Sequence, residues 1–295
     1  MTTFPVQKIE RLIRISKEKP LLPEQFVPWQ EPAEEADLFL PEKLVSLAGH
    51  PLYERLSPAQ RRELGRHEVV QVMYSYGWSE GLACLFFNRH LLDLSPSDVE
   101  YRFLLRELIE EFRHQEMFSK AIEQLDGKPI LPGFQHRFWG KLTVKFLPSD
   151  WVFMSVLAVE MMADVYGKLM RRDPRVYQVL RKVSELHHIE EGRHIHYTKL
   201  WLERYTQNAG FLRRTWYSLL FLLNIYFMRT LYVRREIFER IGVDRPAHYQ
   251  KTAYRHFKHK FAEHCLDEAI EFMEDIGGFN WLTRPLWRLI LKAKV

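Results

Sequence analysis

Histidine and glutamate are concentrated in one short stretch of the chain, HHIEEGRHIH, which runs from His187 to His196. Imidazole nitrogens and carboxylate oxygens are together the donors that iron, manganese and similar cations accept in proteins. The stretch is therefore either one wall of a metal site or a solvated, charged helix face that is rich in histidine. Both interpretations fit the ten residues alone, so the rest of the chain must supply the partners that a metal site needs.

Two copies of the pattern ExxH provide such partners. Glu111 and His114 form the first copy, and Glu191 and His194 form the second. Residues three apart lie on the same side of a helix, so we expect each pair to close on one ion. In each copy the glutamate one position earlier has an arginine, not a histidine, three residues later, and we therefore expect it to play no part.

A lone glutamate in an apolar setting precedes each ExxH. Glu80 lies in YGWSEGLACLFF and Glu160 lies in FMSVLAVEMMADVYG, each with thirty residues between it and the glutamate of the ExxH that follows. The chain thus contains E-x30-E-x2-H twice. This spacing predicts two helical hairpins, each with a lone glutamate on one helix and an ExxH on the next, which is the layout of ferritin-like di-iron carboxylate bundles.

Charge balance gives a physical reason for this pattern. Four carboxylates that face one bundle interior repel each other, and burying them unpaired costs about several kcal/mol per ion. Two divalent cations bring four positive charges and remove the repulsion, and iron or manganese suits mixed oxygen and imidazole donors. A single ExxH is more often solvated surface, and a lone buried glutamate often pairs with an arginine. The repeated spacing favours the metal site over both alternatives.

His187 extends the second copy to HxxxExxH. His187, Glu191 and His194 lie at positions i, i+4 and i+7, which form one stripe along a helix. The alternative for His187 is a core histidine that is hydrogen-bonded to a backbone carbonyl. We expect the other polar residues of this region to face elsewhere: Glu190, Arg193 and His196.

This set of residues resembles that of the non-haem di-iron N-oxygenases typified by p-aminobenzoate N-oxygenase and related arylamine oxygenases. Those enzymes carry a glutamate, an ExxH, another glutamate and an HxxxExxH on successive helices. The matching positions here are Glu80, Glu111, His114, Glu160, His187, Glu191 and His194. The resemblance covers about residues 65–210. It implies a helical bundle that is often dimeric, two iron ions, and oxygenation of an aromatic amine by O2 bound as a peroxo-di-iron species.

Four further residues lie close in sequence to the expected ligands. Cys84 and Asp164 each follow a lone glutamate by four residues, and Glu107 precedes the glutamate of the first ExxH by four. His188 is next to His187. We expect these side chains to lie just outside the ligands, where they could orient them or relay protons. Plain packing is the alternative for Cys84.

The elements that must position these residues are all helical. Gly-poor segments with apolar residues at three- and four-residue steps predict a four-helix core at about residues 60–207 and two further helices: 60–94, 99–126, 149–172, 174–207, then 211–241 and 246–276. Eight of the fifteen prolines precede residue 59, so we expect residues 1–58 to form an extended arm with short helical turns. The prediction is an all-α, ferritin-like four-helix bundle, with residues 59–295 as one oxygenase domain.

Composition restricts the cellular setting and the partners. The two cysteines show no CxxC spacing, and the N-terminus carries charges where a signal peptide would be apolar, so we expect a cytoplasmic protein. The uncharged run 215–228 is too short to span a bilayer, and we expect a buried helix there. From residue 211 onward there are fifteen Lys and Arg against nine Asp and Glu. This basic third either contacts an anionic membrane or is ordinary surface. The membrane interpretation rests on the arginines that flank the run: Arg213, Arg214, Arg229, Arg234 and Arg235.

The leading prediction is an O2-activating di-iron monooxygenase that N-oxygenates an arylamine or another small-molecule substrate. No nicotinamide or flavin motif is present, so electrons must come from an external reductase or ferredoxin. No nucleic-acid-binding motif accompanies the basic charge, and we expect no nucleic-acid partner. Two alternatives stay open: a di-iron hydroxylase or oxidase of a lipophilic or acyl substrate at a membrane surface, and a ferroxidase or other iron-handling protein.

Overall fold

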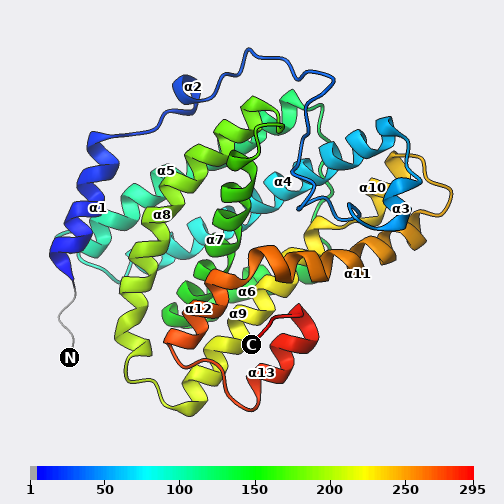
Figure 1. Cartoon of the computed structure of the whole chain (residues 1–295). Coiled ribbons are helices and arrows are strands. Elements are labelled where there is room, and N and C mark those ends of the chain that lie inside the picture. The colour runs from blue at the N-terminus through cyan, green and yellow to red at the C-terminus, as the bar shows by residue number, and fades with distance from the viewer. Residues whose placement is uncertain (1–4) are drawn as a thin grey trace.

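The computed structural model describes residues 5–295 and is helical throughout, with no strand among these residues. Four long helices form the core (Figure 1): α4 (Pro58–Leu91), α5 (Val99–Gln124), α7 (Ser149–Arg172) and α8 (Gln178–Thr206). Helices α4 and α5 pack as one hairpin, and α7 and α8 pack as the other. The prediction of an all-α, ferritin-like bundle is confirmed.

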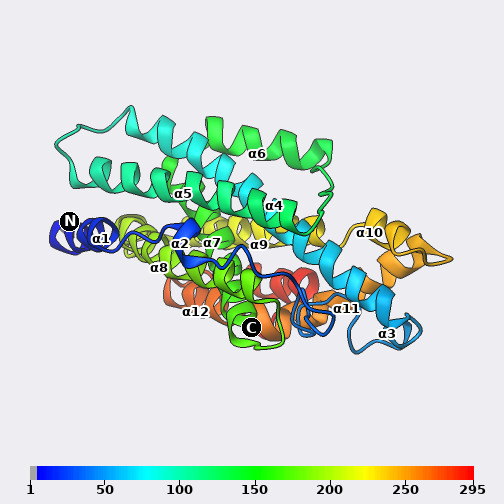
Figure 2. The same cartoon turned by 90° about the horizontal axis from the view of Figure 1, so that it is seen from above.

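The four core helices and their neighbours are arranged in three layers. Figure 2 shows α4, α5 and α6 (Phe134–Phe146) along one side and α11 (Pro246–Cys265) and α12 (Asp267–Asp275) along the other. Helices α7, α8 and α9 (Phe211–Tyr232) lie between them. The remaining elements are short: α2 (Pro23–Phe26), α3 (Pro51–Glu54), α10 (Arg235–Arg240), α13 (Thr283–Leu286) and a π-helical turn, Trp287–Leu291.

Helix α4 illustrates how the sequence sets a helix start. The Ser57 hydroxyl accepts a hydrogen bond from the Gln60 backbone N–H, and the Gln60 side chain accepts one from the Ser57 N–H. This capping box is combined with Pro58 at the first helical position, where a missing N–H costs nothing. The helix then runs for 34 residues and carries Glu80 into the middle of the bundle.

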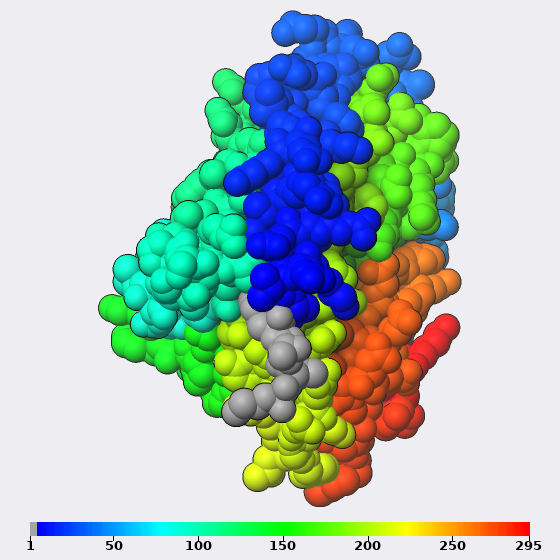
Figure 3. Space-filling view, turned by 90° about the vertical axis from the view of Figure 1, so that its left-hand side faces the viewer, coloured from blue at the N-terminus to red at the C-terminus, as the bar shows by residue number. Residues whose placement is uncertain are grey.

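The N-terminal segment departs from the predicted extended arm. Helix α1 (Val6–Glu18) has thirteen residues and lies between Pro5 and Pro20, where no proline interrupts it. It buries Ile9 and Ile13 against α5 and α8. Figure 3 shows the segment as a strip along one face of the molecule, between the surfaces of α5 and α8. The first four residues of the predicted arm lie outside the described residues.

Helix α6 lies between the predicted helices at 99–126 and 149–172, in a segment for which no helix was predicted. Gly140 explains how α6 can lie so close to α4. A Cβ atom at this position would come within 2.7 Å of the Leu82 Cδ1 atom and 3.2 Å of the Trp78 Cη2 atom. Helix α6 is therefore a wall packed on the bundle, held close by a residue without a side chain.

The apolar run at 215–228 lies within α9, which is largely buried, as expected. No helix within residues 5–295 combines the length and the apolar character needed to cross a bilayer. Arg229 is fully buried and donates to the Ile290 carbonyl, so it is not available to a lipid surface. This removes one of the arginines on which the membrane interpretation of the basic third rested.

Candidate metal centre

The helices bring all seven expected ligands to one buried place. Helix α4 contributes Glu80 and α7 contributes Glu160, while α5 and α8 contribute the two ExxH pairs and His187. The ligand-capable atoms fall into two groups, and within each group they lie within 4.8 Å of one another. The first group is Glu80, His114, His187 and Glu191, and the second is Glu107, Glu111, Glu160 and His194. Every one of these residues is buried.

The two groups place the glutamate and the histidine of each ExxH in different sets, but the donor atoms of each pair also lie within 4 Å of one another, as needed if each pair closes on one ion. The Nδ1 atom of His194 lies 3.0 Å from a Glu111 oxygen and 3.6 Å from a Glu191 oxygen. The Nδ1 atom of His114 lies 3.8 Å and 3.6 Å from oxygens of the same two glutamates. Glu111 and Glu191 therefore lie between the two histidines, where their carboxylates could each reach both ions of a pair.

His187 belongs to the first group and is not a core histidine bonded to a carbonyl. Its Nε2 atom lies 3.1 Å from a Glu80 oxygen and 3.0 Å from a Glu191 oxygen. Its ring stacks on Tyr76, with 5.9 Å between the centroids. Packing thus holds the imidazole in one orientation with its Nε2 atom among the carboxylates.

Glu107 lies among the ligand-capable residues, not outside them as expected. It occupies in the second group the place that His187 occupies in the first, since each lies four residues before the glutamate of an ExxH, and it is 1% exposed. Neither of its carboxylate oxygens has a hydrogen-bond partner. Because Glu107 lies four residues before Glu111, it is one helical turn away on the same face of α5. The spacing could have placed it in the site, but sequence alone did not separate a ligand from a neighbour.

Glu110 and Glu190, which we expected to play no part, are both buried and bind the histidines of the opposite hairpin. The Nε2 atom of His114 lies 3.0 Å from a Glu190 oxygen, and that of His194 lies 2.9 Å from a Glu110 oxygen. A carboxylate on the far nitrogen fixes the tautomer of a histidine, so that Nδ1 is left as the metal donor. The expectation that Glu190 faces elsewhere is wrong.

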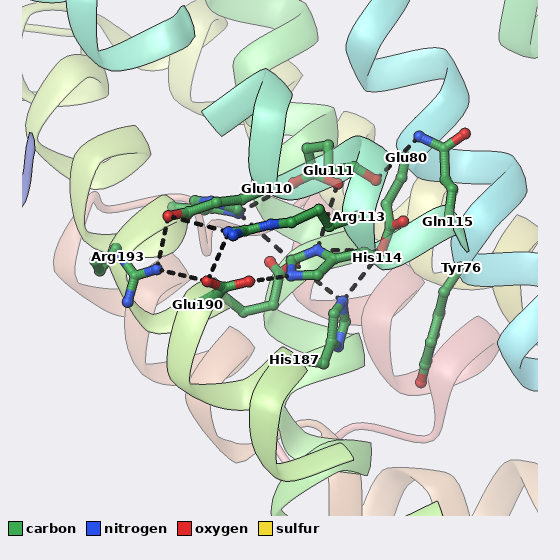
Figure 4. A network of polar contacts seen from close by, with 12 residues as sticks. Tyr76, Glu80, Glu110, Glu111, Arg113, His114, Gln115, His187, Glu190 and Arg193 are labelled. Atoms are coloured by element: carbon green, nitrogen blue, oxygen red, sulfur yellow. Dashed lines mark hydrogen bonds and ion pairs between the residues drawn. The ribbon is translucent and has the colours of Figure 1, made fainter. Parts of the chain in front are cut away.

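Arg113 and Arg193 complete this outer layer (Figure 4). Arg113 donates to Glu190 at 3.0 Å, and Arg193 donates to Glu110 at 2.9 Å and to Glu190 at 3.2 Å. The two positive guanidinium groups balance the two outer carboxylates in a region from which water is largely excluded. Arg193 therefore faces the interior, contrary to expectation, while His196 is exposed as expected. The signal in the sequence was the longer repeat EExRH, present in both EEFRH and EEGRH.

Helix α1 also reaches this layer. The Ser16 hydroxyl donates to a Glu110 oxygen at 2.5 Å and accepts a hydrogen bond from Arg106 at 3.2 Å. Ser16 is buried and stands 94 residues before Glu110 in the chain. The N-terminal segment is thus part of the support of the centre, and no pattern in the sequence indicated it.

Of the other residues expected next to the ligands, Cys84 lies at the centre, whereas Asp164 and His188 make contacts elsewhere. Cys84 is buried beside Glu80 and Glu111, where Gln115 donates to its sulfur at 3.6 Å, and burial raises the pKa of its thiol. Asp164 and His188 instead pair with each other, and Asp164 also pairs with Lys168 at 2.8 Å. The expectation that Asp164 and His188 orient the ligands is therefore wrong, because their polar atoms contact each other and Lys168.

Burial and the charges of neighbouring ligands shift the pKa values of the residues in the two groups. Burial raises the pKa of Glu80 to about 7, with the Glu111 charge adding to it, and burial and the Glu191 charge raise the pKa of Glu160 well above its usual range. Burial acts to lower the pKa of His187, but Glu191 and Glu80 outweigh it and raise that pKa to about 9. Without a metal, these ligands therefore hold protons.

Unsatisfied buried atoms show that the residues present suit metal ions. Five glutamates with three histidines concentrate acidic donors in the interior, and several of their atoms have no hydrogen-bond partner: Glu80 Oε2, Glu111 Oε2, Glu160 Oε2, Glu191 Oε2, His114 Nδ1 and His194 Nδ1. Buried polar atoms normally have partners, so a cluster of orphans on ligand-type atoms calls for one. Mixed carboxylate and imidazole donors fit iron or manganese.

A cavity of about 590 Å³ adjoins these two groups. Glu80, Glu111, Glu160, His187 and Glu191 form part of its wall, and the rest comes from α4, α6, α7 and α9. The open side of the candidate centre therefore faces the cavity and not bulk water.

Comparison with known proteins agrees with this arrangement. The sequence profile of the family described as P-aminobenzoate N-oxygenase AurF matches residues 5–277. The chain belongs to this family. The resemblance inferred from the ligand pattern is thereby confirmed, and the match extends into the N-terminal and C-terminal parts that the pattern did not cover.

Curated relatives carry no assigned activity. An uncharacterised protein of Mycobacterium bovis is 24% identical over 256 residues, which cover 82% of this chain and 73% of the relative. Uncharacterised proteins of two Mycobacterium tuberculosis strains are 24% and 23% identical over the same length and the same shares. The family supports a di-iron N-oxygenase, while these relatives leave the individual reaction to be argued from the site.

Proposed function

We propose that this member of the AurF family is a di-iron monooxygenase that transfers one oxygen atom from O2 to the nitrogen of a small amine. The observation that carries the proposal is the position of the two ligand groups, side by side at the wall of a largely apolar cavity. The ions would be held by Glu80, His114, His187 and Glu191 on one side and by Glu107, Glu111, Glu160 and His194 on the other. Bound iron would supply O2 reduction and oxygen transfer.

The reaction needs electrons that the chain does not provide. Conversion of an amine R–NH2 and O2 to R–NHOH and water consumes two electrons and two protons. An external reductase or ferredoxin would be the donor. The chain's own side chains would hold the ions apart from bulk water and keep the imidazoles of His114 and His194 oriented through Glu190 and Glu110.

An iron-handling role is the competing proposal, and the cavity argues against it. Its wall beyond the ligands is almost entirely apolar, which suits an organic molecule better than the passage of hydrated ions. The proposed function therefore assigns the cavity to substrate.

Anaerobic reconstitution with Fe2+, followed by isotopically labelled O2, a chemical reductant and a panel of amines, tests the proposal. We expect about two irons per chain and a product that carries one labelled oxygen. Glu111→Gln should lose both metal and product, whereas Glu116→Gln, an exposed glutamate on the same helix, should keep both. Iron that accumulates far beyond two per chain without an oxygenated product would overturn the proposal.

A further inference from the structure

Outside the two ligand groups, the cavity beside the candidate centre has no lysine or arginine that could pair with an anionic substrate. Among the residues that line it there is no lysine and no arginine, and its only acidic groups are Glu80, Glu111, Glu160 and Glu191 of the ligand groups. Placing a carboxylate in such a cavity leaves its charge unpaired, which is strongly unfavourable in an apolar interior. The basic residues of α6 lie outside this lining and are exposed: Arg137, Lys141 and Lys145.

Four polar side chains of the wall are engaged with the protein itself, whereas the buried Tyr76 hydroxyl has no hydrogen-bond partner. Ser79, Ser155 and Asn224 each donate to a backbone carbonyl one helical turn earlier, at 2.8–3.0 Å. His136 lies 2.8 Å from the Thr230 hydroxyl, and burial lowers the pKa of His136, which favours its neutral form. Apart from the hydroxyls of Tyr76 and Thr143, a ligand in the cavity therefore meets a predominantly apolar surface.

The entrance is apolar as well. Trp139, Trp216 and Leu223 line the cavity and are also 51%, 37% and 41% exposed, so they connect it with solvent between α6 and α9. Large side chains that stay apolar and exposed at the mouth of a cavity mark a path for an apolar molecule. At about 590 Å³, the cavity is within the range of ligand sites for whole small molecules, roughly 300–1,000 Å³.

We infer that the cavity binds an uncharged, predominantly apolar amine that enters between α6 and α9, and not an amino acid or other carboxylate. The reaction assigned to this molecule rests on the proposed function, but the binding does not. The substrate class thus departs from p-aminobenzoate, for which the family is named: the carboxylate of that compound has no cationic partner in this cavity.

Three probes separate charge from size. p-Aminobenzoate and its methyl ester differ in the negative charge and in one methyl group, and p-hexylaniline carries an apolar tail in place of the carboxylate. Binding is measured on the full-length chain loaded with Co2+ by calorimetry and by the fluorescence of the cavity tryptophans. We expect the ester to bind at least about tenfold more tightly than the acid. We expect p-hexylaniline to bind on the order of 100-fold more tightly than the acid, because its tail is removed from water.

A matched pair of variants on α7 locates the site. Val159 lines the cavity and Val165 does not, and both are partly buried valines on the same helix. Val159→Trp fills the cavity and should weaken p-hexylaniline binding about tenfold or more, while Val165→Trp should leave it unchanged. Co2+ stoichiometry and thermal unfolding, measured on both variants, report whether the ligands and the fold are intact.

Acid and ester that bind equally well would overturn this inference, as would a metal-loaded, folded Val159→Trp variant with unchanged affinity. Failure of the proposed function has a different signature. Tight binding of p-hexylaniline without any oxygen transfer would reject the oxygenase and leave the apolar site in place. Oxygen transfer to p-aminobenzoate as efficient as to its ester would reject the apolar site and leave the oxygenase.

Discussion

Replacing Glu190 with glutamine should selectively weaken the binding of one of the two metal ions. Glu190 is fully buried, accepts from Arg113 and Arg193, and lies 3.0 Å from the Nε2 atom of His114. Glutamine has nearly the same shape but lacks the charge that stabilises this arrangement. Its amide must also place an N–H group beside the N–H donors of Arg113, Arg193 and His114, which is unfavourable.

The size of the effect follows from the role of such partners. Loss of a carboxylate that orients a metal-binding histidine typically costs about 10–100-fold in metal affinity. This corresponds to about 1.4–2.8 kcal/mol at about 1.4 kcal/mol per factor of ten. The loss should fall on the ion held with Glu80, His114, His187 and Glu191. Glu110→Gln should weaken the other ion by a similar factor, because Glu110 contacts His194.

The affinity for both ions is measured by titration with Co2+, whose visible absorption reports binding, and this measurement is independent of turnover. Glu185→Gln is the control, because Glu185 lies on the same helix and pairs with Lys182 in a partly exposed ion pair, at 2.7 Å. Such surface pairs contribute about 0–1 kcal/mol, so the control should bind both ions normally. Wild-type affinity for both ions in Glu190→Gln would refute the crossed support of each histidine by the opposite hairpin.

Three more outcomes follow from the same contacts. His187→Ala should retain part of its iron, because Glu80, His114 and Glu191 remain, but oxygenation should collapse; unchanged turnover measured by product analysis would reduce His187 to a packing residue. Burial and charge give Glu80 a pKa of about 7 and His187 a pKa of about 9 before metal binds, so Co2+ must displace protons. Its apparent affinity should therefore rise from pH 6 to pH 9, and calorimetry in buffers of different ionisation enthalpy should detect proton release near pH 7; binding without release would contradict the protonated ligands. Ser16→Ala removes a buried hydrogen bond to a carboxylate and should lower the free energy of unfolding in urea by about 1–3 kcal/mol, a result that an unchanged midpoint and slope would rule out.

The four core helices and the seven expected ligands could be predicted from the sequence because both depend on short-range spacing. The side-chain period of a helix determines which residues share a face, and the E-x30-E spacing gives the two glutamates of each hairpin the same separation. Both are local properties of the chain. The structure then brings Glu80, Glu160 and the two ExxH pairs together in the interior, as that pattern requires.

Helical periodicity does not determine which residue of the opposite hairpin a given side chain contacts. The contacts of Glu190 with His114 and of Glu110 with His194 join residues 76 and 84 apart, and they depend on how the two hairpins pack. A face of a helix is known from the sequence, but the side chain opposite it is not. For this reason, Glu110 and Glu190 were set aside although their repeat was visible.

The sequence by itself determined an all-helical chain with two matched sets of metal-type donors. The tertiary structure alone decided how Glu111 and Glu191 lie between both histidines, how helix α1 supports Glu110 through Ser16, and how α6 and α9 enclose an apolar cavity. The physical reason is that helix identity follows from short-range spacing along one chain segment. The division of donors between two ions and the shape of an empty space follow from the packing of segments that are far apart in that chain.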